Sequence, residues 1–155
     1  MKLLLFSDSH GNVANMADAV RLERPDRVLH MGDLARDAEE LARRFPDLPV
    51  TYVPGNCDGR RPDLPEERVF TLEGVKIFMT HGHTYHVKSG IALAVRAARE
   101  AGARLLCFGH THEALCEFES GLWIVNPGAA GSIARPTYAV AVLEGDGAVC
   151  YLSNI

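Results

Sequence analysis

Two apolar runs joined by an amphipathic segment make up residues 2–33, KLLLFSDSHGNVANMADAVRLERPDRVLHMGD. The first run, residues 2–7, predicts a buried strand, and residues 27–31 predict a second one. Between them, apolar side chains recur at helical spacing over residues 13–24, and Asn12 is placed to cap that helix. Strand, helix and strand in this order predict a parallel pair with a right-handed crossover.

The same alternation continues with a helix predicted over residues 35–45 and a strand over residues 50–53. After a Pro-rich, charged loop, the pattern changes to a hairpin, one more helix and a series of strands. The helix is expected at residues 89–101 and the strands at 68–72, 75–80, 104–108, 114–119, 122–125, 137–143 and 148–153. The fold class is therefore α/β, and two sheets covered by helices on their outer faces account for every segment.

Length and composition limit the classes of function. With 155 residues, of which 47% are hydrophobic, the chain is expected to form a single domain over residues 1–155. A net charge of −4 provides no positive field for a nucleic acid polymer. No apolar run approaches the roughly 18 residues of a membrane span. The N-terminal run is too short for a signal peptide, and no cysteines form a C-x-x-C pair, so we expect a cytoplasmic protein with reduced thiols.

Residue types that bind divalent metals occur in five short clusters, each just after a strand-like run. The clusters are Asp8-Ser9-His10, Gly32-Asp33, Gly55-Asn56-Cys57-Asp58, His81-Gly82-His83 and Gly109-His110-Thr111-His112. Asp, Asn and His donors suit Mn²⁺, Fe²⁺, Ni²⁺ or Zn²⁺. Because open α/β sheets place ligands beyond the carboxyl ends of their strands, the clusters are expected to meet. They indicate a two-metal hydrolase, in which two cations about 3.5–4 Å apart share a hydroxide and require a bridging carboxylate.

Spacing within the clusters limits which side chains reach the same ion. Asp8 and His10 lie two residues apart at one strand end, so both can reach one ion. His110 and His112 have the same spacing, but a loop can direct them to different ions. Glycines precede the Asp and Asn of the second and third clusters, where they let the backbone turn sharply. His30 lies inside a strand, so we expect it to be buried and hydrogen-bonded rather than a ligand.

Taken in order, the motifs D-x-H, G-D, G-N-x-[DE], H-G-H and G-H-x-H resemble the calcineurin-like metallophosphoesterase superfamily. The third motif, with Cys57 after its Asn, is similar to that of the small YfcE-type phosphodiesterases, which carry Cys where larger relatives carry His. The resemblance covers nearly the whole chain, from Ser7 to the turn at Asn126-Pro127-Gly128. Ala129 follows this turn, where the family often has Ser.

The resemblance implies a four-layer α/β/β/α sandwich with mixed sheets and a centre of two divalent ions. The implied ligands are Asp8, His10 and His112 for the first ion and Asn56, His81 and His110 for the second, with Asp33 bridging both. Mn²⁺ is the ion that we expect first, with Ni²⁺, Fe²⁺, Zn²⁺ and Mg²⁺ as alternatives, because such donor sets accept several ions.

The activity implied is that of a metal-dependent phosphodiesterase, in which a bridging hydroxide attacks a small organic phosphodiester in line. Two alternatives remain open. One is a nucleotide or dinucleotide polyphosphate phosphatase with the same site, and the other is a protein-interaction scaffold like the small retromer subunit. The expected partner is a small phosphoester substrate rather than a nucleic acid polymer or a membrane. Assembly into a homodimer or homotetramer is also left open.

Cys57 and His83 are the candidates for catalytic roles beyond the ligands. Larger relatives use the His after the Asn to support the leaving group, whereas Cys57 is a weak donor. Substrates with good leaving groups are therefore expected to react fastest. His83 and His86 are candidates to replace the missing acid. Arg135 and Lys88 are candidates for a phosphate contact, although a solvated charge is the favoured interpretation for each.

Overall fold

A computed structural model describes all 155 residues as ten strands, three α-helices and two short 3₁₀ turns. The strands are β1 (Lys2–Phe6), β2 (Arg27–His30), β3 (Val50–Tyr52), β4 (Glu67–Leu72), β5 (Val75–Thr80), β6 (Leu105–Cys107), β7 (Leu115–Glu119), β8 (Leu122–Asn126), β9 (Thr137–Glu144) and β10 (Gly147–Asn154). One sheet has the order β10-β9-β1-β2-β3 and the other β4-β5-β6-β8-β7. Both are mixed: β1, β2 and β3 run parallel, as do β5, β6 and β8, with antiparallel strands beside them.

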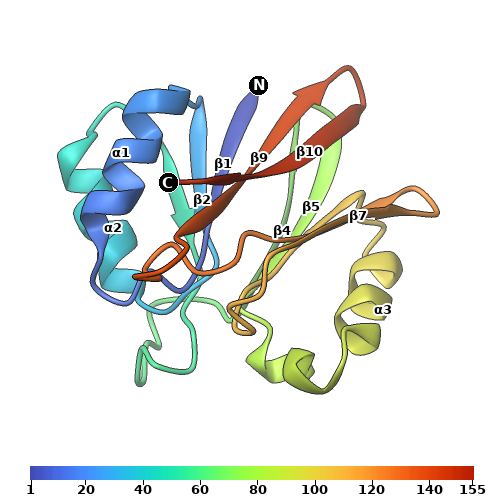
Figure 1. Cartoon of the computed structure of the whole chain (residues 1–155). Coiled ribbons are helices and arrows are strands. Elements are labelled where there is room, and N and C mark those ends of the chain that lie inside the picture. Colours follow the sequence, from blue (N-terminus) through green and yellow to red (C-terminus); the bar gives the residue numbers. More distant parts are fainter.

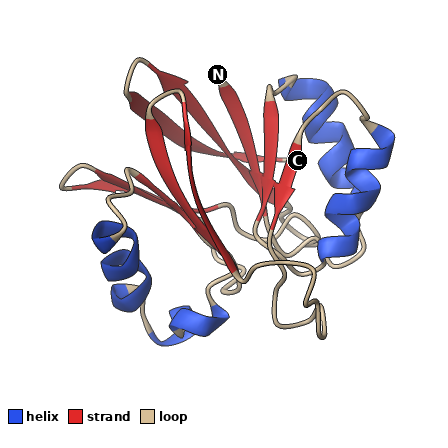
Figure 2. Cartoon of the chain, turned by 180° about the vertical axis from the view of Figure 1, so that it is seen from behind, coloured by secondary structure: helices blue, strands red, loops and turns tan.

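The helices cover the two outer faces of the sandwich. Helices α1 (Val13–Glu23) and α2 (Ala35–Arg44) lie against the first sheet, and α3 (Ala92–Glu100) lies outside the second, as Figures 1 and 2 show. The layers therefore follow the order α/β/β/α, which confirms the predicted fold. No helix combines the length and the hydropathy needed to cross a bilayer.

The alternating side chains of β1 show how the layers are held together. Leu3 and Leu5 belong to a cluster of 15 buried residues between the sheets. Leu4 and Phe6 belong to a second cluster of 12, packed against α1 and α2. A third cluster of 9 buried residues lies under α3. Because β1 is covered on both faces, it reads as a continuous apolar run rather than an alternating one.

The predicted elements are all present, with one difference at α3. Asn12 caps α1 as expected, since its side chain accepts a hydrogen bond from the N–H of Asn15 at 3.1 Å. The helix expected from residue 89 begins at Ala92, because Gly90 has φ 137° and ψ 157°, outside the helical region. Two 3₁₀ turns, η1 (His83–Tyr85) and η2 (Val87–Ser89), precede it and were not predicted.

Candidate metal centre

The five predicted clusters lie in loops that follow the carboxyl ends of β1, β2, β3, β5 and β6. The backbone of these loops is unusual, because five of the seven predicted ligands have positive φ. The values are 54° for Asp8, 45° for His10, 50° for Asp33, 71° for His110 and 61° for His112. Positive φ is uncommon in residues other than glycine, and such strained positions gather at functional sites. The strain turns these side chains toward one another.

Close approach of the loops requires glycine at two positions. A Cβ on Gly55 would lie 2.0 Å from Oδ1 of Asp33, and one on Gly109 would lie 1.8 Å from Oγ of Ser7. No side chain larger than hydrogen fits at such distances. The glycines therefore let the β3 loop pack on the β2 loop and the β6 loop pack on the β1 loop.

The first group of donors consists of Asp8, His10 and His112. Oδ1 of Asp8 lies 3.1 Å from Nε2 of His112 and 3.8 Å from Nε2 of His10, and the two imidazole nitrogens are 3.4 Å apart. This oxygen of Asp8 is buried and has no hydrogen-bond partner. A buried carboxylate oxygen without a partner is costly. An oxygen and two imidazole nitrogens facing one point fit a divalent cation.

The second group of donors gathers around His81. Its Nε2 lies 3.5 Å from Oδ2 of Asp33 and 3.1 Å from Oδ1 of Asn56. The ring of His110 is 5.0 Å from the ring of His81, centroid to centroid. The donor atoms of Asp8, Asp33 and His81 all lie within 4.8 Å of one another, while His110 and Asn56 lie beside this close group.

Asp33 lies between the two groups. Its Oδ2 is 3.5 Å from His81 and 4.0 Å from Nε2 of His10, and its Oδ1 accepts a hydrogen bond from the N–H of Cys57 at 2.9 Å. Burial alone would raise the pKa of Asp33, but hydrogen bonding and the charge of His81 hold it well below its usual value. The carboxylate therefore stays ionised at the position where a bridging ligand is required.

Asp58 fixes the β2 and β3 loops to each other. Its carboxylate accepts hydrogen bonds from three backbone N–H groups: Gly55 at 2.6 Å, Ala35 at 2.7 Å and Asp33 at 3.2 Å. It belongs to the third sequence cluster, but the sequence analysis gave it no role. The Asx-type hydrogen bond back to Gly55, three residues earlier, is the local signal that could have indicated one.

A buried chain of hydrogen bonds supports the β1 loop from behind. Ser9 Oγ lies 2.9 Å from Nε2 of His30 and donates to Oδ2 of Asp37 at 2.7 Å, and Gly11 N–H donates to the same oxygen. The N–H of Gly32 donates to Nδ1 of His30. Burial lowers the pKa of His30 to about 4, so its imidazole is neutral. The expected buried role of His30 is confirmed, whereas Asp37, four residues before Leu41 on the buried face of α2, was missed.

Asn126 supports the His-rich loop. Its amide donates to the carbonyl of Gly109 at 3.1 Å and to Oγ1 of Thr111 at 2.9 Å, on either side of His110. The sequence analysis included this Asn in the turn that resembles the superfamily motif, without assigning its contacts. The resulting support holds His110 and His112 at one end of β8.

The two catalytic candidates lie on the second group's side. The ring of His83 is 5.4 Å from that of His81, its Nε2 is 3.6 Å from Oε2 of Glu66, and its Nδ1 is buried without a partner. Burial lowers its pKa. Cys57 is exposed, and a hydrogen bond with Asp33 raises the pKa of its thiol, so it is a poor nucleophile. His86 is exposed.

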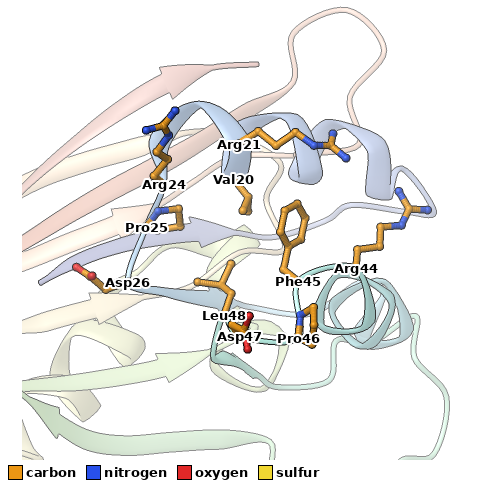
Figure 3. Close-up of a pocket in the computed structure, with 10 residues that line it drawn as sticks. All are labelled: Val20, Arg21, Arg24, Pro25, Asp26, Arg44, Phe45, Pro46, Asp47 and Leu48. Atoms are coloured by element: carbon orange, nitrogen blue, oxygen red, sulfur yellow. The ribbon is translucent and has the colours of Figure 1, made fainter.

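The largest hollow of the molecule lies elsewhere. It is a groove of about 780 Å³ between the ends of α1 and α2, shown in Figure 3. Val20, Phe45 and Leu48 form its apolar part, and three arginines, two aspartates and two prolines line the rest. It adjoins the amino-terminal end of β2, whereas the metal-ligand candidates lie beyond the carboxyl-terminal ends of the strands. No His or Cys lines it.

The chain is similar to known phosphoesterases over most of its length. The profile of the calcineurin-like phosphoesterase superfamily domain matches residues 1–146. A probable metallophosphoesterase of Bacillus subtilis, YsnB, is 36% identical over 157 residues, covering 96% of this chain and 88% of the relative. Phosphodiesterase MJ0936 of Methanocaldococcus jannaschii is 27% identical over 146 residues, covering 83% of each chain.

Solved structures share the fold over the whole chain. A conserved protein of Streptococcus pneumoniae, described as a predicted phosphoesterase, aligns with a TM-score of 0.81 at 25% identity, over 99% of this chain and 88% of its own. Vps29 of Entamoeba histolytica, solved in complex with Zn²⁺, aligns with a TM-score of 0.78 at 20% identity, over 99% of both chains. The second similarity concerns the fold alone.

Proposed function

The chain belongs to the calcineurin-like phosphoesterase superfamily, and on that premise we propose that it is a metal-dependent phosphodiesterase acting on small organic phosphodiesters. The observation that supports this most directly is the buried oxygen of Asp8, which has no partner and faces two imidazoles, next to a carboxylate shared between two groups of donors. Such an arrangement is costly without cations. The named phosphodiesterase among the relatives supports the reaction class.

The proposed division of ligands follows the two groups. Asp8, His10 and His112 hold one cation, and Asn56, His81 and His110 hold a second, with Asp33 between them. When bound, such cations lower the pKa of the attacking water and neutralise charge on the phosphate. His81 Nδ1 lies 2.6 Å from the carbonyl of Met31, which fixes the ring so that Nε2 points into the centre. Mn²⁺ is the first ion to test.

Few side chains near the centre are able to donate a proton to the leaving alcohol or phenol. Cys57 is a weak donor, and the lowered pKa of His83 leaves its imidazole mostly neutral at pH 7. The chain therefore favours diesters whose leaving alcohol or phenol is acidic. We place His83 in contact with the substrate, since its ring lies 6.1 Å from that of His110 and its Nδ1 has no partner in the chain.

Metal stripping and reloading test this function. The protein is treated with a chelator and then titrated with Mn²⁺, while bound metal and hydrolysis of bis(p-nitrophenyl) phosphate are measured together. Activity should rise with occupancy and reach its maximum near two ions per chain. A protein that binds no divalent ion and hydrolyses no phosphoester would contradict the proposal and favour the scaffold alternative.

A further inference from the structure

A second pocket adjoins the metal centre on one side only. It has a volume of about 340 Å³ and is lined by Asp8, His10 and His112 of the first donor group, together with Ser132 and Arg135. None of the second group (Asn56, His81 and His110) lines it. The pocket therefore extends from the centre past the first group. An ester substituent of a phosphodiester bound at the centre has this space available to it.

The loop that carries Arg135 is anchored to the ligand loop after β1. The N–H of Ala130 donates to the carbonyl of Ser7 at 3.0 Å, and that of Gly131 donates to the carbonyl of Asp8 at 3.2 Å. A Cβ on Gly131 would lie 2.1 Å from the carbonyl oxygen of Ser9, so the two loops are in direct contact. This contact sets the position of the pocket's outer wall relative to Asp8.

The loop is also closed on itself. The N–H of Thr137 donates to the carbonyl of Ala129 at 3.3 Å, and its Oγ1 donates to the carbonyl of Pro127 at 2.8 Å. Within the loop, the N–H of Arg135 donates to Oγ of Ser132 at 3.1 Å. The backbone of Arg135 is thus held in place, so a ligand that binds its side chain does not also have to order the loop.

The guanidinium of Arg135 has no carboxylate partner. Of the other arginines, Arg21, Arg43, Arg44, Arg61, Arg96 and Arg104 each form an ion pair in the chain. Arg135 bonds only through its backbone, and its side chain is exposed beside the pocket. Guanidinium groups bind phosphate and carboxylate through two parallel hydrogen bonds. A negative group in this pocket would therefore find an unused partner.

We propose that Arg135 selects substrates that carry a second anionic group, a phosphate or a carboxylate, on the ester substituent that enters this pocket. The inference rests on the proposed phosphodiesterase function and refines its substrate class. It favours diesters and anhydrides with a further charge over uncharged diesters. Arg135 acts here as a specificity residue, because the scissile phosphate lies at the metal centre and the second anion lies beyond it.

Matched synthetic substrates test the proposal. In p-nitrophenyl alkyl phosphates with two to five carbons, the alkyl chain ends in methyl, carboxylate or phosphate, and every compound has the same scissile bond and leaving group. For at least one length, an anionic end should lower KM about tenfold relative to methyl, which corresponds to about 1.4 kcal/mol, with a smaller change in kcat. The carboxylate and phosphate series show which anion is preferred.

Variants separate the role of Arg135 from a general charge effect. Arg135→Ala should abolish the preference, and Arg135→Lys should retain part of it. Arg24→Ala removes another arginine without an ion pair, in the groove of Figure 3, and should leave the preference unchanged. Equal KM values for all chain ends in the wild type would overturn the proposal. So would an equal loss of kcat/KM for every substrate in Arg135→Ala, which would place Arg135 on the scissile phosphate.

A binding measurement keeps the inference separate from the proposed function. Calorimetric titration with alkanediol bisphosphates and with alkyl monophosphates of equal length needs no turnover. The bisphosphate should bind about tenfold more tightly to the wild type and to Arg24→Ala, but not to Arg135→Ala. If no substrate is hydrolysed while this difference persists, the phosphodiesterase function fails and the anion site stands. Hydrolysis without the difference gives the opposite result.

Discussion

The first sheet has two edges across its strands, one where β1 and β2 end and one where β2 begins, and they differ in the burial and pairing of their charged side chains. At the first edge, Asp8 and Asp33 are almost completely buried, one with an oxygen that has no partner, and the backbone around them has positive φ. At the second edge lies the larger groove of Figure 3, whose Arg21 and Arg44 are each paired with a carboxylate at 2.9 Å. Backbone strain and a buried carboxylate oxygen without a partner, rather than the volume of a hollow, therefore distinguish the proposed metal centre from the groove.

The largest expected effect is a loss of activity when the aspartate between the two donor groups is replaced. Asp33→Asn keeps an acceptor for the N–H of Cys57 but removes the charge shared by the two donor groups. Even outer-sphere changes at metal sites cost about 10–100-fold, so we expect hydrolysis of bis(p-nitrophenyl) phosphate in Mn²⁺ to fall more than about a hundredfold. The bound metal per chain should fall with it.

Asp47→Asn in the groove is the matched control for that exchange. Asp47 is exposed and has no ion pair or hydrogen bond through its side chain, so its loss should change neither activity nor metal content. If Asp33→Asn kept full activity, or Asp47→Asn removed it, the contrast between the two edges would be wrong.

A smaller effect, on stability and metal affinity, is expected when Asp58 no longer connects the β2 and β3 loops. Asp58→Ala leaves the N–H groups of Asp33, Ala35 and Gly55 without their acceptor. Hydrogen bonds to charged groups contribute about 1.5–3 kcal/mol each, part of which water recovers. We expect the free energy of unfolding to fall by about 2–4 kcal/mol and the metal affinity to fall about tenfold. Denaturant unfolding and metal titration measure the two changes.

Asp63→Ala is the control for Asp58, since Asp63 lies in the neighbouring loop and pairs with Arg61 at the surface. Exposed pairs contribute about 0–1 kcal/mol, so this variant should remain close to the wild type in stability. If Asp63→Ala lost as much stability as Asp58→Ala, the stabilisation would come from negative charge in this region and not from the three hydrogen bonds of Asp58.

The sequence predicted the fold and the meeting of the clusters because both depend on local patterns. Apolar runs gave the strands, and each polar cluster followed a strand end, so the topology alone brought the clusters together. The sequence could not predict that His110 lies beside the close donor group, or that Asp37 and Asp58 hold the loops. These features depend on loop geometry at positive φ, on the 3₁₀ turns after β5, and on packing between elements distant in the chain.

The buried imidazole of His30 predicts a pH dependence of stability. Gly32 donates to Nδ1, so the proton lies on Nε2 toward Ser9, and a second proton would face the N–H of Gly32. The folded pKa of about 4 lies below the value of about 6.5 for the unfolded chain. Between these values the unfolded chain binds more protons. The contribution is therefore complete above pH 6.5 and is lost as the pH falls toward 4, by about 3 kcal/mol in total.

His30→Gln tests this contribution, because Gln accepts and donates hydrogen bonds but does not titrate in this range. Urea unfolding of the metal-free protein between pH 4.5 and 7 should show a shallower pH dependence for His30→Gln than for the wild type. His86→Ala, which removes an exposed His, should keep the wild-type slope. Identical slopes for the wild type and His30→Gln would contradict the neutral buried imidazole.

The smallest effect is expected for Cys57→His, which should change the selectivity between leaving groups rather than the overall rate. The substitution removes the hydrogen bond between the thiol and Asp33 but keeps the one from the backbone N–H of residue 57 to Oδ1 of Asp33, and the exposed side chain leaves room for an imidazole. A protonated imidazole can donate to a departing alkoxide, which a thiol with raised pKa does poorly. Rates for p-nitrophenyl esters should therefore stay within a few-fold of the wild type, whereas diesters with alkyl leaving groups should react about tenfold faster. A series of leaving groups of graded pKa measures this as a shallower dependence in Cys57→His. If the wild type itself showed no dependence on the leaving group, another side chain, for which His83 is the candidate, would already supply the proton.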